Sequence, residues 1–241
     1  MKKLVLALAL LAGAVSAQAA DFVDTSKPKD IINFGLRFGI TSSSLSADLP
    51  GTATDYAFSW RRGFATGAVV DVNIRDFFSI RPAIYFENRS YDYTMVDNEP
   101  DSRALSVSLG HTRRNALSVP VLASFHFNIS NAVRWDVETG PYFTFGLGSG
   151  KDHVNAVSVS APEGTQGSYT NISAHRDYYG DQAWQHRSFD LGWQIGTGIE
   201  VLRHYVFNIS YQHSLRNATD HDNIGYSMKN KGWTFAVGYV F

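Results

Sequence analysis

Large apolar residues alternate with small or polar residues in eight segments of this 241-residue chain. In the last segment, Gly232 to Phe241, every second residue from Trp233 onward is large and apolar. Successive side chains of a β-strand point to opposite faces, so each segment is predicted to be a strand with one apolar and one small or polar face. The predicted strands span residues 33–40, 63–74, 77–88, 117–127, 133–146, 189–200, 205–212 and 232–241.

The connections between these strands alternate between short and long. The short ones are 75–77, 128–132 and 202–204, and the long polar ones are 41–61, 93–115, 147–187 and 215–230. Short turns at one end and long loops at the other are typical of outer-membrane barrels, whose short turns face the periplasm. We therefore predict an all-β fold, an eight-stranded antiparallel transmembrane up-and-down β-barrel with long extracellular loops.

A soluble, exported β-sandwich or lipocalin-like barrel would show the same alternation, with the apolar faces turned inward. Two features favour the membrane barrel. The polar face is rich in glycine, which suits a narrow lumen, and the apolar face carries aromatics such as Trp135, Trp193 and Trp233, as interface girdles require. Pro82 and Pro120 fall inside predicted strands, and since proline cannot donate to a ladder we expect a bulge or a strand end at each.

The N-terminus has the pattern of a targeting segment. Two lysines precede an apolar run from Leu4 to Val15, and an A-x-A cleavage site ends at Ala19. A short N-terminal anchor is the alternative, but the run is shorter than the roughly 20 residues that a membrane-spanning helix needs. The predicted division is a signal peptide at 1–19, a periplasmic N-terminal segment at 20–30 and an outer-membrane barrel domain at 31–241.

Composition and motifs exclude several kinds of site. The chain has no cysteine, which rules out disulfides, cysteine-ligated metals and thiol nucleophiles. Its formal net charge of -1 gives no reason to expect a nucleic-acid partner. It contains no P-loop, Rossmann glycine fingerprint, H-E-x-x-H or G-x-S-x-G motif, so we predict neither an enzyme nor a cofactor.

Charged residues of both signs fall on the predicted inner face of the strands. Eight strands enclose a lumen just wide enough for side chains to fill, and buried charges are tolerated only when they are paired and hydrogen-bonded. We therefore predict a charge network that plugs the lumen, with a narrow ion or proton path as the alternative. The predicted members are Arg37, Asp71, Arg81, Glu87, Arg134, Asp136, Glu138, Asp190 and Glu200.

Two groups outside the lumen could carry chemistry. Histidines and aspartates in the third and fourth long connections could bind a metal, although their spacing fits no known ligand pattern. They are His153, His175, His186, His221, Asp177, Asp181 and Asp222. His213 and Ser214 could form part of a hydrolase site, as in outer-membrane lipid A deacylases, but no acidic residue is clearly placed beside them.

The third long connection is too long to be a simple linker. Residues 153–161 and 167–175 both alternate and could extend the fifth and sixth strands above the membrane. Its exposed aromatics fit a binding surface or a cover for the barrel mouth equally well. These aromatics are Tyr169, Tyr178, Tyr179 and Trp184.

Several short motifs together resemble the porin-family β-barrel domain common in Bacteroidetes. They are SIRPAIYF (79–86), ALSVPVLASFHF (116–127), GPYFTFGLG (140–148), FDLGWQIGTGIEV (189–201) and YQHSLRNAT (211–219). The resemblance covers about residues 31–241 and implies a small eight-stranded outer-membrane barrel, with Pro82 as a family feature. It implies no single activity, although the family includes a component of the secretion apparatus for gingipain-type proteases. His213-Ser214 replaces a glycine usual in the family, and the shared motifs look structural.

Three functions remain open from the sequence. The main prediction is a structural or surface-interaction barrel with a filled lumen, in the outer membrane of a Gram-negative bacterium. The alternatives are an accessory component of protein secretion or envelope assembly, and an outer-membrane enzyme acting on lipid A. Expected partners are outer-membrane lipid and lipopolysaccharide, the barrel-assembly machinery, and surface or secretion partners at the long loops, with the barrel as a monomer. Phe241 resembles the C-terminal assembly signal of outer-membrane proteins, so we expect barrel assembly to need it.

Overall fold

The computed structural model describes residues 22–48, 54–99, 104–160, 167–180, 185–219 and 227–241. The predicted signal peptide, 1–19, lies outside these ranges. No helix within them has the length and hydropathy that crossing a membrane as a helix requires. The strands are β1 (Ile32–Asp48), β2 (Thr54–Arg75), β3 (Phe78–Arg89), β4 (Tyr91–Glu99), β5 (Ala104–Ser130), β6 (Val133–Ser160), β7 (Ser168–Arg176), β8 (Phe189–Val201), β9 (Tyr205–Ser214) and β10 (Ser227–Val240).

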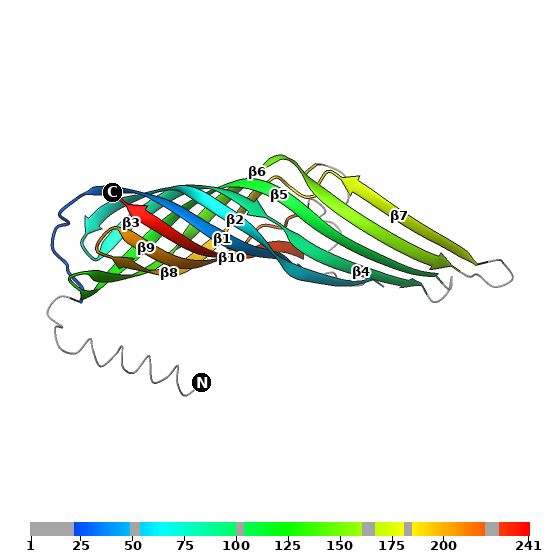
Figure 1. Ribbon diagram of the computed structural model, residues 1–241, viewed down its shortest axis with the longest axis horizontal. Helices are drawn as coiled ribbons and strands as arrows, with labels where there is room; N and C mark the ends of the chain where they lie inside the picture. The colour runs from blue at the N-terminus through cyan, green and yellow to red at the C-terminus, as the bar shows by residue number, and fades with distance from the viewer. Residues whose placement is uncertain (1–21, 49–53, 100–103, 161–166, 181–184, 220–226) are drawn as a thin grey trace, which may run out of the picture.

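Eight of these strands close into a barrel (Figure 1). Going round the ring, the order is β1, β2, β3, β5, β6, β8, β9 and β10, and β10 pairs back with β1. Every neighbouring pair is antiparallel and follows chain order. The predicted all-β, eight-stranded, up-and-down barrel is therefore confirmed.

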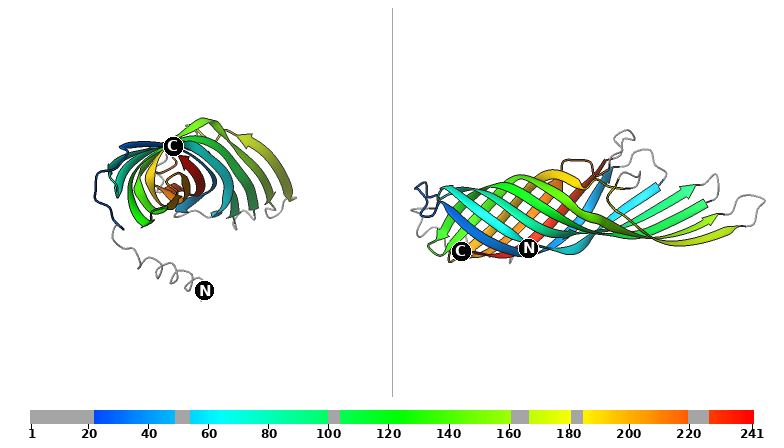
Figure 2. Two further views of the ribbon diagram at one scale, coloured as in Figure 1. Left: turned by 60° about the vertical axis from the view of Figure 1, so that its left-hand side comes forward. Right: turned by 90° about the horizontal axis from the view of Figure 1, so that it is seen from above.

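The strands continue well beyond the ring on the side opposite the short turns (Figure 2). There β2, β4, β5, β6 and β7 pair in that order as an open sheet. We call this sheet the wing; it comprises 54–60 of β2, all of β4, 104–113 of β5, 152–160 of β6 and all of β7. Much of the predicted long connections is therefore strand. The expected extension of the fifth predicted strand is confirmed for 153–160 within β6, whereas 168–176 forms a separate strand, β7, which pairs with β6 and does not extend β8.

The barrel wall is apolar outside and polar inside. In β1, Phe34, Leu36 and Phe38 are 60%, 55% and 57% exposed, whereas Arg37 between them is 7% exposed. The closing strand repeats the pattern, since Phe235 is 55% exposed. A soluble β-sandwich or lipocalin-like barrel would bury this aromatic face, so the structure excludes that alternative.

The two prolines inside strands mark neither bulges nor strand ends. Pro82 lies within β3 opposite Val121, and Pro120 lies within β5 opposite Tyr142, with the same register on both sides of each. The predicted bulges at these prolines are therefore wrong. Each proline removes one N–H group, and the rest of the closed ring holds the register without it.

Glycine on the inner face makes room for large lumen side chains. A Cβ at Gly192 would overlap the Tyr142 ring, and a Cβ at Gly67 would lie 2.6 Å from the Tyr85 ring. Tyr142 is fully buried. The glycine-rich inner face thus allows aromatic rings to cross a lumen that would otherwise be too narrow for them.

The N-terminal segment packs along the short turns. The Phe22 ring stacks on the Phe127 ring, with ring centres 5.2 Å apart. The backbone carbonyl of Phe22 accepts a hydrogen bond from the Asn128 amide at 3.0 Å. The carbonyl of Asp24 accepts one from the Phe77 amide at 3.0 Å. The described part of the predicted 20–30 segment therefore lies at the short-turn end of the barrel.

Candidate functional site

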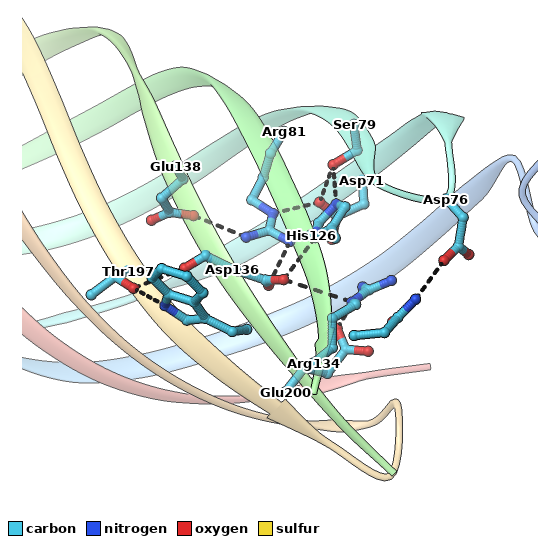
Figure 3. Close-up of polar contacts among 12 residues, drawn as sticks. Asp71, Asp76, Ser79, Arg81, His126, Arg134, Asp136, Glu138, Thr197 and Glu200 are labelled. Atoms are coloured by element: carbon cyan, nitrogen blue, oxygen red, sulfur yellow. Dashed lines mark hydrogen bonds and ion pairs between the residues drawn. The ribbon is translucent and has the colours of Figure 1, made fainter. Parts of the chain in front are cut away.

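Arg81 lies at the centre of an ion-pair network in the lumen (Figure 3). Its side chain is 2% exposed and pairs with Asp71 through Nε, with Glu138 through Nη1 at 2.9 Å and with Asp136 through Nη2 at 3.4 Å. These side chains come from β2, β3 and β6, and strand alternation turns all of them inward. One guanidinium on β3 thus joins three carboxylates from two other strands, β2 and β6.

Two more arginines extend the network. Arg134 pairs with Glu200 at 2.8 Å and with Asp136 at 3.6 Å. Arg37 lies 3.7 Å from Glu138 on the other side. The structure therefore brings together most of the predicted lumen residues in one layer, nearer the short-turn end.

His126 is a further member of this layer, beyond the predicted charge network. Its Nδ1 lies 2.7 Å from Asp136 and its Nε2 lies 2.9 Å from the Ser79 hydroxyl. The ring is 1% exposed. His126 therefore links an acidic side chain of β6 to β3, and both nitrogens of its buried ring have a hydrogen-bonding partner.

Glu87 lies outside this layer, in a second polar layer higher in the lumen. It pairs with Arg89, two residues along the same strand, at 2.6 Å. Arg89 also contacts Gln212, whose Nε2 donates to the Gln194 side-chain oxygen at 2.8 Å. A cavity of about 20 Å³ remains beside this layer, which is room for about one water.

Asp190 also lies apart from the Arg81 layer. It accepts hydrogen bonds from the Ser214 hydroxyl at 2.5 Å and from the Asn230 side chain at 3.1 Å. Asn230 in turn accepts a hydrogen bond from Arg114 Nη1 at 3.0 Å. Arg114 is thus connected to Asp190 through one amide, a link that no short-range sequence signal indicates.

The structure separates the candidate hydrolytic pair. Ser214 is fully buried in the lumen, whereas its neighbour His213 belongs to the opposite face of β9, where it stacks on Tyr211. The acid beside Ser214 is Asp190, which the sequence did not place there. His213 and Ser214 therefore cannot act together as a nucleophile and base.

Three tyrosines and one leucine form a cluster at the wing end of the lumen. We call it the mouth cluster; its members are Leu45, Tyr91, Tyr93 and Tyr178. The Arg114 guanidinium carbon lies 4.7 Å from the Tyr178 ring centre and 5.2 Å from that of Tyr91. Burial raises the pKa of Tyr91 to about 12 and that of Tyr178 well above its usual value. The phenols are therefore neutral hydrogen-bonding groups, and they cover the top of the lumen.

Three histidines form a row across the outer face of the wing. His111, His153 and His175 are direct cross-strand neighbours on β5, β6 and β7, with ring centres 4.6 Å and 4.3 Å apart. Desolvation lowers the pKa of His111, with Arg61 adding to the effect, and it lowers the pKa of His153, with His175 adding to it.

No group of three histidine, cysteine, aspartate or glutamate side chains is placed to hold a metal within the described ranges. His186 lines a cavity on the opposite face of the wing, away from this row. The remaining metal candidates, His221, Asp181 and Asp222, lie outside the described residues, as does Trp184. His111 was missed from the sequence because only the strand register brings it beside His153.

Phe241, the expected assembly signal, ends the chain against β1. Its amide donates to the Phe34 carbonyl at 2.8 Å, and its ring meets Tyr239 edge-on at 5.3 Å. The side chain is 70% exposed. It therefore lies on the outer surface at the short-turn end of the barrel.

Three solved structures illustrate what this chain is similar to. The attachment invasion locus protein Ail of Yersinia pestis matches with 15% identity and a TM-score of 0.38 over 87% of this chain and 98% of its own. OprG from Pseudomonas aeruginosa matches with 10% identity and a TM-score of 0.43 over 90% and 99%, and Neisserial surface protein A with 12% and 0.36 over 86% and 96%. No curated protein matches the sequence. The family model described as outer membrane protein beta-barrel domain matches residues 17–220, so the chain belongs to that family, and it is an outer-membrane protein of a Gram-negative bacterium.

Proposed function

We propose that this protein is a closed, non-enzymatic barrel that holds the wing outside the outer membrane as a surface for contacts with other molecules. The observation that carries the proposal is an apolar patch on the outer face of the wing. Leu105 and Leu109 of β5 and Val159 of β6 are 45%, 54% and 46% exposed, and Leu105 pairs directly with Val159. Exposed apolar patches on soluble surfaces mark interaction sites.

The position of the lipid boundary supports this role. Along the outer faces of five neighbouring barrel strands, large apolar residues give way to polar ones near the wing end of the barrel. The last apolar residues are Ile40, Phe64, Phe86, Leu117 and Trp233, and the next outward residues are Ser42, Arg62, Asn88, Asn115 and Lys231. The wing begins beyond this boundary, so its apolar patch faces water rather than lipid.

The filled lumen supports a role that does not depend on conduction. Three groups of side chains fill the lumen one after another along the barrel. They are the Arg81 layer, the second polar layer around Glu87 and Arg89, and the mouth cluster. In planar bilayers we expect no stable conductance steps of porin size. Well-resolved conductance steps of porin size from the pure protein would show that the barrel is not closed.

Adhesion of whole cells to octyl-coated beads tests the wing. The variant Leu105→Ser/Leu109→Ser/Val159→Ser is expected to lose most of the adhesion that expression of the protein confers. A matched control changes three polar neighbours on the same face, Thr94→Ser, Asn98→Ser and Asn155→Ser. Both variants should keep the gel shift between unheated and boiled samples that a folded barrel shows. Equal adhesion of the two variants would contradict the proposal.

A second candidate function, an accessory role in secretion or envelope assembly, is favoured by the wing edge. In the described sheet β7 is the last strand and pairs with β6 alone, and an open strand edge can accept a strand of another chain. The motifs shared with the Bacteroidetes porin-family domain support the same idea. A deletion strain that exports its proteins normally, with none retained in the periplasm, would exclude this role.

We extend the proposal to lipid partners. Lys231 Nζ lies 5.4 Å above the Trp60 ring, and Arg62 occupies the same boundary on β2. Cations at this height suit the phosphates of lipopolysaccharide. The stability of the protein refolded into vesicles with and without lipopolysaccharide tests this contact. The variant Arg62→Ser/Lys231→Ser should lose the stabilisation that lipopolysaccharide gives to the wild type.

A further inference from the structure

We propose that the wing cavity, above the mouth cluster, binds a small uncharged molecule with a flat aromatic body and a hydroxyl group. The cavity measures about 630 Å³, and its lining includes Tyr56, Phe58, Met95, Val154, Ala174 and His186. Binding sites for small molecules are typically apolar concavities of 300–1,000 Å³ with few polar groups. The inference deepens the proposed function and rests on it in one respect, that the wing stands outside the membrane.

Aromatic side chains dominate the lining. Tyr56 and Phe58 of β2 stack with ring centres 6.4 Å apart, and Phe58 meets Tyr91 edge-on at 5.7 Å. Tyr91 and Tyr178 continue the same surface at 6.2 Å. Rings gain from offset or edge contacts with another ring beyond the area that they bury, so a flat aromatic body fits this lining better than a flexible chain.

The charges on the lining are already paired. Asp152 accepts a hydrogen bond from the Tyr93 hydroxyl at 2.8 Å and pairs with Arg176 at 2.8 Å. Arg114 does not belong to the lining: it lies behind the rings of Tyr91 and Tyr178, and its Nε and Nη2 have no hydrogen-bond partner among the described residues. A charged ligand would therefore lose its hydration without gaining an opposite charge.

His186 supplies the polar contact. Both of its ring nitrogens are buried and have no hydrogen-bond partner among the described residues. Its ring stacks on Tyr178 at 4.3 Å and 12°, which fixes its plane. Burial, with Arg114 nearby, lowers the pKa of His186 to about 3, so the ring is neutral at pH 7. A neutral imidazole has one donor and one acceptor, and a hydroxyl group can complement either of them.

Binding of naphthol, naphthalene and naphthalenesulfonate to the mature protein in nanodiscs tests these steps. Equilibrium dialysis against empty nanodiscs separates binding to the protein from partition into lipid. We expect saturable binding of naphthol, about tenfold weaker binding of naphthalene for the loss of one hydrogen bond, and weaker binding still of the sulfonate. Absence of saturable naphthol binding, or tighter binding of the sulfonate, would overturn the inference.

Two variants assign the binding to this cavity. Ala174→Trp fills it and should weaken naphthol binding by at least tenfold. His186→Phe keeps the ring on Tyr178 and should bind naphthol and naphthalene equally. The matched control is His204→Phe, because His204 stacks on Tyr239 in the same way at 5.3 Å and 7° at the other end of the barrel. Unchanged naphthol preference in His186→Phe would overturn the assignment, whereas the adhesion test of the wing patch would stand unaffected.

Discussion

Replacing Arg81 by methionine should destabilise the barrel more than any other single change in the lumen. Methionine is unbranched and uncharged but two atoms shorter than arginine, so the substitution removes the cation while keeping much of the side-chain volume. Arg81 is the shared partner of Asp71, Asp136 and Glu138. Removing one partner of a buried ion pair costs roughly 3–5 kcal/mol, because the remaining charge is left uncompensated.

The three carboxylates differ in the partners that they keep after Arg81 is replaced. Asp136 keeps His126 and Arg134, and Glu138 keeps Arg37 and Asn208. Among the described residues Asp71 keeps only the Ser79 hydroxyl, at 3.4 Å.

Asp71 should therefore account for most of the loss. The double variant Arg81→Met/Asp71→Asn should recover about half of the lost stability, with a coupling energy of about 1–3 kcal/mol between the two positions.

Urea unfolding from lipid vesicles, followed by tryptophan fluorescence and by the gel shift of unheated samples, measures these free energies of unfolding. A suitable control is Arg203→Met, because Arg203 is exposed and lies 3.8 Å from Asp76 in a turn. A loss of less than about 1 kcal/mol in the free energy of unfolding of Arg81→Met would refute the central role of Arg81. So would a further loss of stability when Asp71→Asn is added.

Three further outcomes follow from single positions. Leu202 has a positive φ of 55° in the short turn after β8, so Leu202→Asn should raise the free energy of unfolding by about 1 kcal/mol in the same urea titration. The pKa of His186 is about 3 when folded, below the unfolded value near 6.5, so the unfolded chain takes up the proton first. The mouth region should lose stability as pH falls from 6.5 toward 3, which faster hydrogen exchange of residues 178–180 and 185–187 would show, and His186→Phe should remove this pH dependence. Deleting Phe241 should lower the amount of barrel in the membrane more than deleting Gly167, and equal amounts of the two would contradict the assembly role.

The inward and outward sets could be predicted from sequence because they depend only on the period of two. Arg37 and Arg81 are inward for the same reason that Phe38 and Ile80 are outward. The pair Glu87–Arg89 was also accessible, since residues two apart on one strand share a face. The pair Asp190–Ser214 was not, because it depends on the register that sets Gly192 opposite Ser214.

The wing could not be predicted in full because alternation changes face along β2. In the barrel Phe64 is outward and Ala65 inward, but in the wing Trp60 pairs with Tyr91 and Phe58 with Tyr93. An extra residue between these regions shifts which side chains face inward, and a periodic pattern does not reveal it. The histidine row and the wing cavity both depend on the pairings beyond this point, so neither was visible in the sequence.

Closure of the lumen at three levels, the Arg81 layer, the Glu87–Arg89 layer and the mouth cluster, has a consequence for conduction. An ion passing the Arg81 layer must still cross the mouth cluster, where Tyr91 and Tyr178 are 3% and 2% exposed. Leaving water for such a site carries a large desolvation penalty. Arg81→Met should therefore remain non-conducting in planar bilayers despite its lower stability, because the Glu87–Arg89 layer and the mouth cluster still close the lumen. If Arg81→Met alone produced stable channels, the ionic layer would be the single barrier and the mouth cluster would close nothing.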